Sequence, residues 1–179
     1  MVILVGVAIA FFLIGGDKDS INNSNVNIID CGKVSEDIDF YNKDYLKENS
    51  DIKKNLECSS INLRDCNPSK IIFLNSIESI FSVGGKENNN CIVKYKSGDK
   101  AVECKFTLNQ LNTIYKSSEE VGNEHLTSRL LIEVLSSLLR SSPIGEHYES
   151  NLKSIFGFSS GVDKKIVETE KFKCEIIPA

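Results

Sequence analysis

Tryptophan is absent from this chain, and histidine, proline and methionine are scarce, with two, three and one residues respectively. The scarcity of histidine narrows the acid–base and metal chemistry open to the chain, because histidine is the side chain most often used for both. The sequence also has no C-x-x-C and no H-E-x-x-H motif. These absences argue against a thioredoxin-like redox site and against a zinc peptidase built on that helix motif.

Clustered positive charge is lacking as well, and the formal net charge is −4. Proteins that bind a phosphate backbone concentrate Lys and Arg in one patch, so the scattered basic residues argue against a nucleic-acid partner. The 25 acidic residues are also scattered, without a pair of carboxylates at a spacing that suits general acid–base catalysis.

The two histidines each follow a glutamate, at Glu124-His125 and Glu146-His147, near the start of an expected helix. These pairs would form a metal site only if the two helices met. The simpler interpretation, which we favour, is that both lie in solvent, where glutamate suits the positive end of a helix. We therefore predict no catalytic residue, no cofactor and no metal site.

An even number of cysteines is spread through the chain: Cys31, Cys58, Cys66, Cys91, Cys104 and Cys174. An even set of this kind favours a disulfide framework in an exported protein. A zinc site is the competing interpretation, but zinc ligands typically lie about two to four residues apart, and the shortest gap here is longer. We predict that these six residues form structural disulfides in an oxidising compartment.

Residues 1–16 are continuously apolar and contain no charged side chain. As a helix they would extend roughly 24 Å, slightly less than the roughly 30 Å hydrocarbon core of a bilayer. No basic residue precedes this run and no good cleavage site follows it, which favours an uncleaved membrane anchor over a signal peptide. Either segment would export the rest of the chain. A soluble core helix is a third interpretation.

Residues 17–27 are polar and aperiodic, so we expect a linker between the membrane and a domain that spans residues 28–179. Asn22 begins an Asn-Asn-Ser sequence that fits the glycosylation pattern.

Residues 91–106 predict a β-hairpin with one apolar and one polar face, because side chains alternate along a strand. A turn centred on Ser97-Gly98 would place Cys91 opposite Cys104, at a position where the strands approach closely enough for a disulfide. The apolar face would carry Cys91, Val93, Tyr95, Val102, Cys104 and Phe106.

Further strands are expected within residues 26–31, 70–83 and 166–177, from their apolar content or alternation. Residues 70–83 fit one long strand or a hairpin broken at Asn75-Ser76, and the pattern does not decide between them. The buried face would carry the odd positions Ile71, Phe73, Ile77, Phe81 and Val83. Cys31 and Cys174 lie in the first and last of these strands, and we expect them to tie the two ends of the domain together.

A helix is expected over residues 41–63, with a restart near Ser50, and Asn67-Pro68 should end it. Further helices are expected after a capping box at residues 107–110, over residues 125–140, where leucines form a continuous stripe, and over a short segment at 148–156, from the spacing of its apolar residues beginning at Tyr148. A continuous first helix would place Cys58 and Cys66 about 12 Å apart along its axis, too far to bridge. Each cysteine would then need a partner on the sheet, unless the last turn unwinds.

One part of the chain resembles a recurrent small domain. The sequence Cys58-x7-Cys66-x-Pro68, followed by Gly84-Gly85 and by two cysteines on a hairpin, is similar to uncharacterised membrane-anchored proteins of uncultured archaea and small-genome bacteria. The resemblance covers roughly residues 50–110. It implies an extracytoplasmic α+β module and brings no known activity.

Together these patterns predict an α+β fold, with an antiparallel sheet of four or five strands covered on one face by helices, and an N-terminal hydrophobic anchor helix. We expect a membrane-anchored extracytoplasmic binding or assembly module without catalytic activity, with a protein partner at the cell surface. Residues 84–90 and 157–163 are the expected recognition loops. The alternatives are a subunit of a surface filament or membrane complex packed through its apolar N-terminus, and an uncharacterised surface enzyme.

Overall fold

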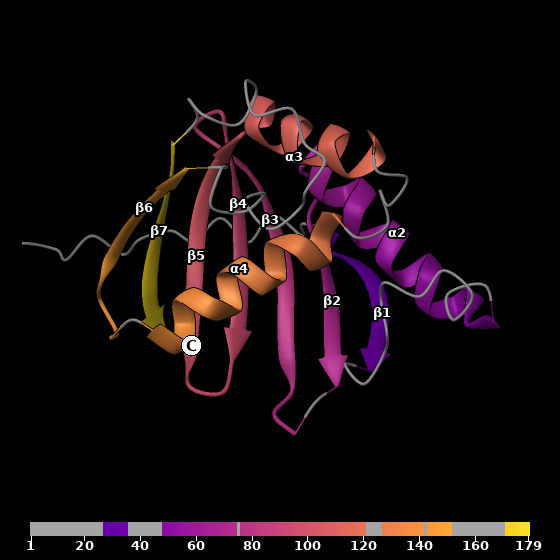
Figure 1. Ribbon diagram of the computed structural model, residues 1–179, viewed down its shortest axis with the longest axis horizontal. Coiled ribbons are helices and arrows are strands. Elements are labelled where there is room, and N and C mark those ends of the chain that lie inside the picture. Colours follow the sequence, from indigo (N-terminus) through magenta and orange to yellow (C-terminus); the bar gives the residue numbers. More distant parts are fainter. Residues whose placement is uncertain (1–26, 36–47, 75, 121–126, 142, 152–170) are drawn as a thin grey trace, which may run out of the picture.

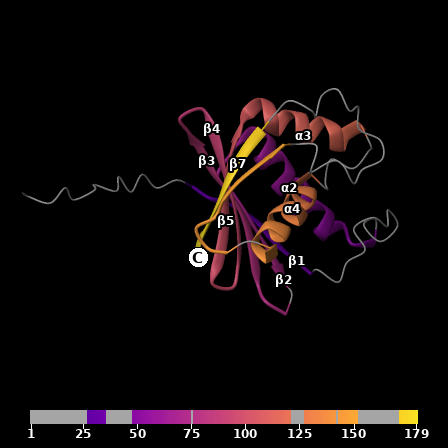
Figure 2. The same ribbon diagram turned by 60° about the vertical axis from the view of Figure 1, so that its left-hand side comes forward.

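The computed structural model describes residues 27–35, 48–74, 76–120, 127–141, 143–151 and 171–179. Within these ranges, one sheet is covered on one face by three helices (Figures 1 and 2). The helices are α2 (Ser50–Asp65), α3 (Leu108–Glu120) and α4 (Thr127–Ser141). The strands are β1 (Ile29–Ser35), β2 (Ser69–Leu74), β3 (Ser79–Glu87), β4 (Asn90–Ser97), β5 (Lys100–Thr107), β6 (His147–Asn151) and β7 (Lys171–Pro178).

The strand order is β1-β2-β3-β4-β5-β7-β6, and every neighbouring pair is antiparallel except β1 and β2. The predicted α+β class, with helices on one face, is confirmed. The sheet is larger than the four or five strands predicted, and it is not wholly antiparallel. The chain returns from β1 to β2 through α2, and a crossover of this kind brings the second strand back in the same direction.

Residues 69–87 form two strands, so the hairpin alternative is the correct one for the Ile- and Phe-rich segment. Ile71, Phe73, Phe81 and Val83 are buried, as the alternation predicted. Ile77 was placed on the same face but lies in the connection between β2 and β3, where 58% of its surface is exposed.

The β4–β5 hairpin has the predicted faces but a different register. Its turn is centred on Gly98 and Asp99, so Cys91 lies opposite Phe106 and Val93 lies opposite Cys104. Gly98 has a φ of +63° and takes the first central position, where tight hairpin turns favour glycine. The shift equals two residues, which leaves each side chain on its predicted face.

The segment predicted as a short helix at residues 148–156 begins instead as the edge strand β6, which pairs with β7. The helical interpretation depended on apolar residues from Tyr148 onward at helix-like spacing. Pairing with β7 satisfies the backbone groups of this segment, and Tyr148 remains 39% exposed at the sheet edge. The remainder of that segment lies outside the described residues.

All six cysteines are paired, as predicted, but the partners differ from those expected. The disulfides are Cys31–Cys58, Cys66–Cys91 and Cys104–Cys174. A Cys91–Cys104 bridge is excluded by the hairpin register. A Cys31–Cys174 bridge is excluded because four strands lie between β1 and β7, which corresponds to about 24 Å at ordinary strand spacing.

Two of the disulfides join the helical layer to the sheet. Cys58 and Cys66 do not bridge each other, and each finds a partner on a strand, in β1 and β4 respectively. Cys66 follows α2 directly and has a left-handed conformation, with its N–H donating to carbonyls of the last helical turn. The helix therefore ends just before Asn67-Pro68, as the proline predicted.

The predicted capping box at the start of α3 is present. The Thr107 N–H donates to Gln110 Oε1 over 2.8 Å, and the Gln110 N–H donates to Thr107 Oγ1 over 3.2 Å. Gln110 Nε2 also donates to the Lys171 carbonyl over 2.8 Å, so this side chain ties α3 to β7.

Replacing Gln110 by alanine is expected to lower the free energy of unfolding by about 1–2 kcal/mol, because a buried cap and an interelement hydrogen bond are lost together. Chemical denaturation followed by circular dichroism measures the change. Asn112→Ala, an exposed change in the same helix, is the matched control. Equal stability of the two variants would contradict a stabilising role for the capping box.

The leucine-rich stripe predicted for residues 125–140 is the buried face of α4 from Thr127 onward. Leu131, Leu135 and Leu138 pack into the core, and Ser128 shares a buried hydrogen bond with Ser60 of α2 over 3.3 Å. Figure 1 shows α4 crossing the sheet obliquely, which brings its C-terminal half over β4 and β5.

The predicted anchor at residues 1–16, most of the linker at 17–27 and Asn22 lie outside the described residues, so these assignments stay predictions. In the part of the chain that the structure describes, no helix is both long enough and apolar enough to span a bilayer.

Candidate functional site

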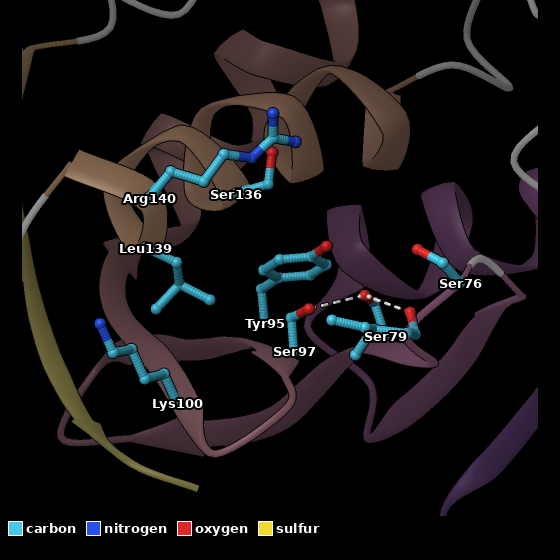
Figure 3. Close-up of a pocket in the computed structure, with 9 residues that line it drawn as sticks. Ser76, Ser79, Tyr95, Ser97, Lys100, Ser136, Leu139 and Arg140 are labelled. Carbon is cyan, nitrogen blue, oxygen red and sulfur yellow. Dashed lines mark hydrogen bonds between the residues drawn. The ribbon is translucent and has the colours of Figure 1, made fainter.

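A hollow of about 380 Å³ lies between the C-terminal half of α4 and the ends of β3, β4 and β5 (Figure 3). We call it the main hollow. Its lining combines hydroxyl, cationic and apolar side chains: Ser76, Ile77, Ser79, Tyr95, Ser97, Lys100, Ser136, Leu139 and Arg140.

The sheet side of the main hollow is a polar row that crosses three strands. Ser79, Ser97 and Lys100 are register partners across β3, β4 and β5. Phe81, Tyr95 and Val102 form the neighbouring row on the same inward face, two residues away along each strand. The inward face therefore changes from apolar to polar between these two rows. The floor of the hollow is therefore where the hydrophobic core ends.

Two serine hydroxyls in this row are hydrogen-bonded to each other. Ser79 Oγ donates to Ser97 Oγ over 3.1 Å and also lies 3.4 Å from the Ile77 carbonyl oxygen. Ser79 is 1% exposed and Tyr95 is 4% exposed, so these polar groups are held within packed structure. Figure 3 shows the Tyr95 hydroxyl directed toward the side of the hollow where the two serines lie.

The helical side of the main hollow comes from one face of α4. Ser136, Leu139 and Arg140 are spaced three and four residues apart, which places them next to one another on a helix. Leu139 is buried, whereas Arg140 is exposed. The Ser136 hydroxyl donates to the Glu133 carbonyl over 3.0 Å, so it remains an acceptor and not a donor toward the hollow.

The charge of the main hollow is positive. Lys100 and Arg140 reach it from β5 and α4, and no carboxylate is among the described residues that line it. Figure 3 shows the two cationic groups apart from each other and from the Ser79–Ser97 pair: the Arg140 guanidinium lies beside Ser136, and the Lys100 ammonium lies on the other side of Leu139 from Tyr95. Their combined positive charge favours an anionic ligand in the hollow.

A second hollow of about 250 Å³ adjoins the first along α4. The two share Ser136 and Arg140, and the second also involves Arg129 and Glu133. Arg129 Nε lies 3.4 Å from Glu133 Oε1, so the charge of Arg129 is balanced on its own helix. Arg140 therefore stands between the two hollows as their shared cation.

Among the described residues that the sequence suggested for a site or a disulfide, the six cysteines and His147, none lines either hollow. His147 is exposed on β6, and His125 lies outside the described residues. Among the described residues, no group of three or more His, Cys, Asp or Glu is placed to hold a metal ion. All six cysteines are in disulfides away from the hollows.

The two expected recognition loops also lie elsewhere. In the first, residues 84–87 belong to β3 and residue 90 begins β4, which leaves only a two-residue turn at Asn88 and Asn89. This turn is at the opposite end of β3 from the main hollow. The second, residues 157–163, falls outside the described residues.

One sequence signal was available for the site but was not used. Along β4 the inward positions read Cys91, Val93, Tyr95 and Ser97, so a serine continues an otherwise apolar face. Identifying the site also required the correct hairpin register and the direction in which α4 crosses the sheet. Neither can be read from the residue pattern.

Comparison of this chain with protein-family models, with curated proteins and with solved structures finds no match in any of the three. The resemblance of residues 50–110 to membrane-anchored proteins therefore stays a prediction, and any function has to be argued from the geometry.

Proposed function

We propose that this chain is an extracytoplasmic binding module that recognises a ligand group in the main hollow. Three disulfides within the described residues fit an oxidising environment outside the cytoplasm. The continuous apolar run at residues 1–16 supports attachment to a membrane. The proposed arrangement is a tethered domain that presents its hollow to the cell exterior or the periplasm.

The main hollow carries this proposal. Its walls are a helix, three hydrogen-bonded strands and the β2–β3 connection that carries Ser76 and Ile77, so most of its side chains are held on regular elements. Its volume of about 380 Å³ is within the range of about 300–1,000 Å³ that is usual for ligand pockets. Its lining is mainly polar, with Ile77, Leu139 and the Tyr95 ring as its apolar part, so it suits a ligand that carries a polar group.

Binding is favoured over catalysis by the placement of the polar groups. A serine and a lysine can act together as nucleophile and base when their side chains are within hydrogen-bonding distance. In Figure 3 the Lys100 ammonium points away from the Ser97 hydroxyl, which accepts a hydrogen bond from Ser79 instead. The serines thus hold one another in place, and the lysine ammonium is directed away from both of them.

The surface-enzyme alternative is favoured by one sequence observation. Residues 157–161 read Gly-Phe-Ser-Ser-Gly, which fits the G-x-S-x-G pattern of a hydrolase nucleophile at Ser159, but they lie outside the described residues. A fluorophosphonate probe that labels the wild-type chain but not Ser159→Ala would support this alternative. No labelling of either chain would leave binding as the proposed role.

A fragment screen by two-dimensional NMR tests the binding proposal on the full chain. We expect a subset of small fragments to shift the amide signals of Ser79, Ser97 and Lys100. Ser136→Trp, which places an indole in the main hollow, is expected to abolish these shifts. Ser82→Trp, on the opposite face of the sheet, should leave them unchanged. A folded chain whose hollow signals respond to no fragment would contradict the proposal.

A further inference from the structure

We infer that the main hollow binds an oxyanion, a carboxylate or a phosphate, carried on a small apolar body. This inference rests on the proposed binding function and names its ligand class. Three features carry it: two cations that have no carboxylate partner, hydroxyl groups placed to donate, and an exposed apolar wall.

Lys100 and Arg140 differ from four lysines on the open face, the face of the sheet that the described helices leave uncovered, although Lys96 on that face is likewise in no ion pair among the described residues. There, four lysines are each in an ion pair with N···O distances from 2.9 to 3.6 Å: Lys70–Asp30, Lys94–Glu103, Lys105–Glu87 and Lys173–Glu149. Within the described part of the chain, Lys100 and Arg140 form no such pair. An anionic ligand would supply the charge that the open face supplies with its own carboxylates.

The hydroxyl groups are suited to donate to an anion. A serine hydroxyl has one hydrogen to donate, and that of Ser79 is shared between Ser97 Oγ, over the shorter distance of 3.1 Å, and the Ile77 carbonyl oxygen at 3.4 Å. Ser97 accepts that bond, and among the described residues it donates to no other group, so its own hydrogen is available to a ligand. The Tyr95 hydroxyl lies at the same side of the hollow and provides a second donor.

Arg140 adds directional hydrogen bonding to the recognition of an oxyanion. Its guanidinium is a planar fork that can hold both oxygens of a carboxylate or two oxygens of a phosphate, whereas lysine provides a point charge. Arg140 reaches the hollow from the helix and Lys100 from the sheet, so an oxyanion between them would contact both layers of the fold.

The apolar wall indicates that the ligand is more than an inorganic ion. Ile77 is 58% exposed at the edge of the hollow, and Leu139 and the Tyr95 ring, both largely buried, also line it. A bare phosphate occupies only a small part of about 380 Å³ and would leave this surface in water. An aromatic or aliphatic body attached to the oxyanion would cover it.

The test compares five probes on the full chain by NMR titration: benzoate, phenyl phosphate, inorganic phosphate, benzamide and benzylamine. We expect benzoate and phenyl phosphate to shift the signals of Tyr95 and Ser97. Phenyl phosphate should bind at least about fivefold more tightly than inorganic phosphate, because its ring covers the apolar wall. Benzamide has the shape of benzoate without its charge, and it should bind weakly or not at all, as should the cationic benzylamine.

Substitutions of Lys100 and Arg140 test whether benzoate binds in the main hollow. Lys100→Gln and Arg140→Gln should each weaken benzoate binding by about fivefold to tenfold, the range expected for one charge-assisted hydrogen bond at a solvent-accessible site. Lys94→Gln and Lys173→Gln, on the open face, remove the same charge and should leave binding unchanged. Equal weakening by all four variants would show non-specific attraction and would overturn the inference.

The remaining outcomes separate the ligand class from the binding function. If benzamide or benzylamine binds in the main hollow and benzoate does not, the oxyanion class is overturned while the proposed binding function stands. If inorganic phosphate binds as tightly as phenyl phosphate, the apolar body is overturned. If neither these probes nor the wider fragment screen affects the hollow, both proposals fail.

Discussion

Replacing Cys104 and Cys174 together by alanine is expected to lower the free energy of unfolding by about 4 kcal/mol, the value that the chain-entropy model gives for a loop of this length. The two residues are 70 positions apart in sequence and are register partners on β5 and β7. Both side chains are buried. The disulfide also secures β7, and through it the edge strand β6, to the rest of the sheet.

Denaturant unfolding without reductant measures this loss. The Cys31→Ala/Cys58→Ala variant is the matched control, because it removes a disulfide that closes a separation of only 27 residues. The same model gives about 3.5 kcal/mol for that pair, so the Cys104–Cys174 deletion should be the more destabilising of the two. A loss below about 1 kcal/mol would show that the β5–β7 bridge does not constrain the unfolded chain.

Phe172→Ala is expected to destabilise the fold by about 3–5 kcal/mol, the usual cost of removing a buried phenylalanine. Phe172 of β7 is 1% exposed, and its ring stacks on that of Phe106 of β5 with 4.9 Å between ring centroids. The substitution leaves a cavity where the last two strands join the core. Thermal and chemical denaturation both report the change.

Leu74→Ala is the control. Leu74 is 44% exposed, so its replacement should lower the free energy of unfolding by less than about 1 kcal/mol. A double-mutant cycle with Phe106→Ala isolates the ring contact, and we expect a coupling of about 0.5–1.5 kcal/mol beyond the area buried. Additive effects would show that the two rings stabilise the core independently. A loss at Phe172 no larger than at Leu74 would contradict the packing of β7.

Alternation of side chains predicted which face of the hairpin is buried, but not its register. A two-residue shift of the turn moves Cys91 away from Cys104 without moving either side chain to the other face. Cysteine partners depend on distances of a few ångströms between elements, so a correct count of disulfides came with wrong pairings. Cys58 and Cys66, in α2 and directly after it, are the exception, because the rise of the helix between them excludes a bridge.

The strand β6 was predicted as a helix because it lies at the edge of the sheet. Within the described residues, β6 pairs only with β7, and its exposed residues show no alternation that would separate a strand from a helix turn. The main hollow was missed for a related reason. Arg140 and Lys100 lie far apart in sequence, and only the oblique path of α4 over the sheet brings them to one cavity.

The disulfide pattern is the most direct test of this fold and of the compartment proposed for it. A lysine or arginine lies between every two consecutive cysteines, so trypsin can separate all six, and mass spectrometry without reduction can identify the linked peptides. The fold predicts Cys31 linked to Cys58, Cys66 to Cys91, and Cys104 to Cys174. Finding Cys91 linked to Cys104, Cys31 linked to Cys174, or six free thiols in protein from its native host would contradict it.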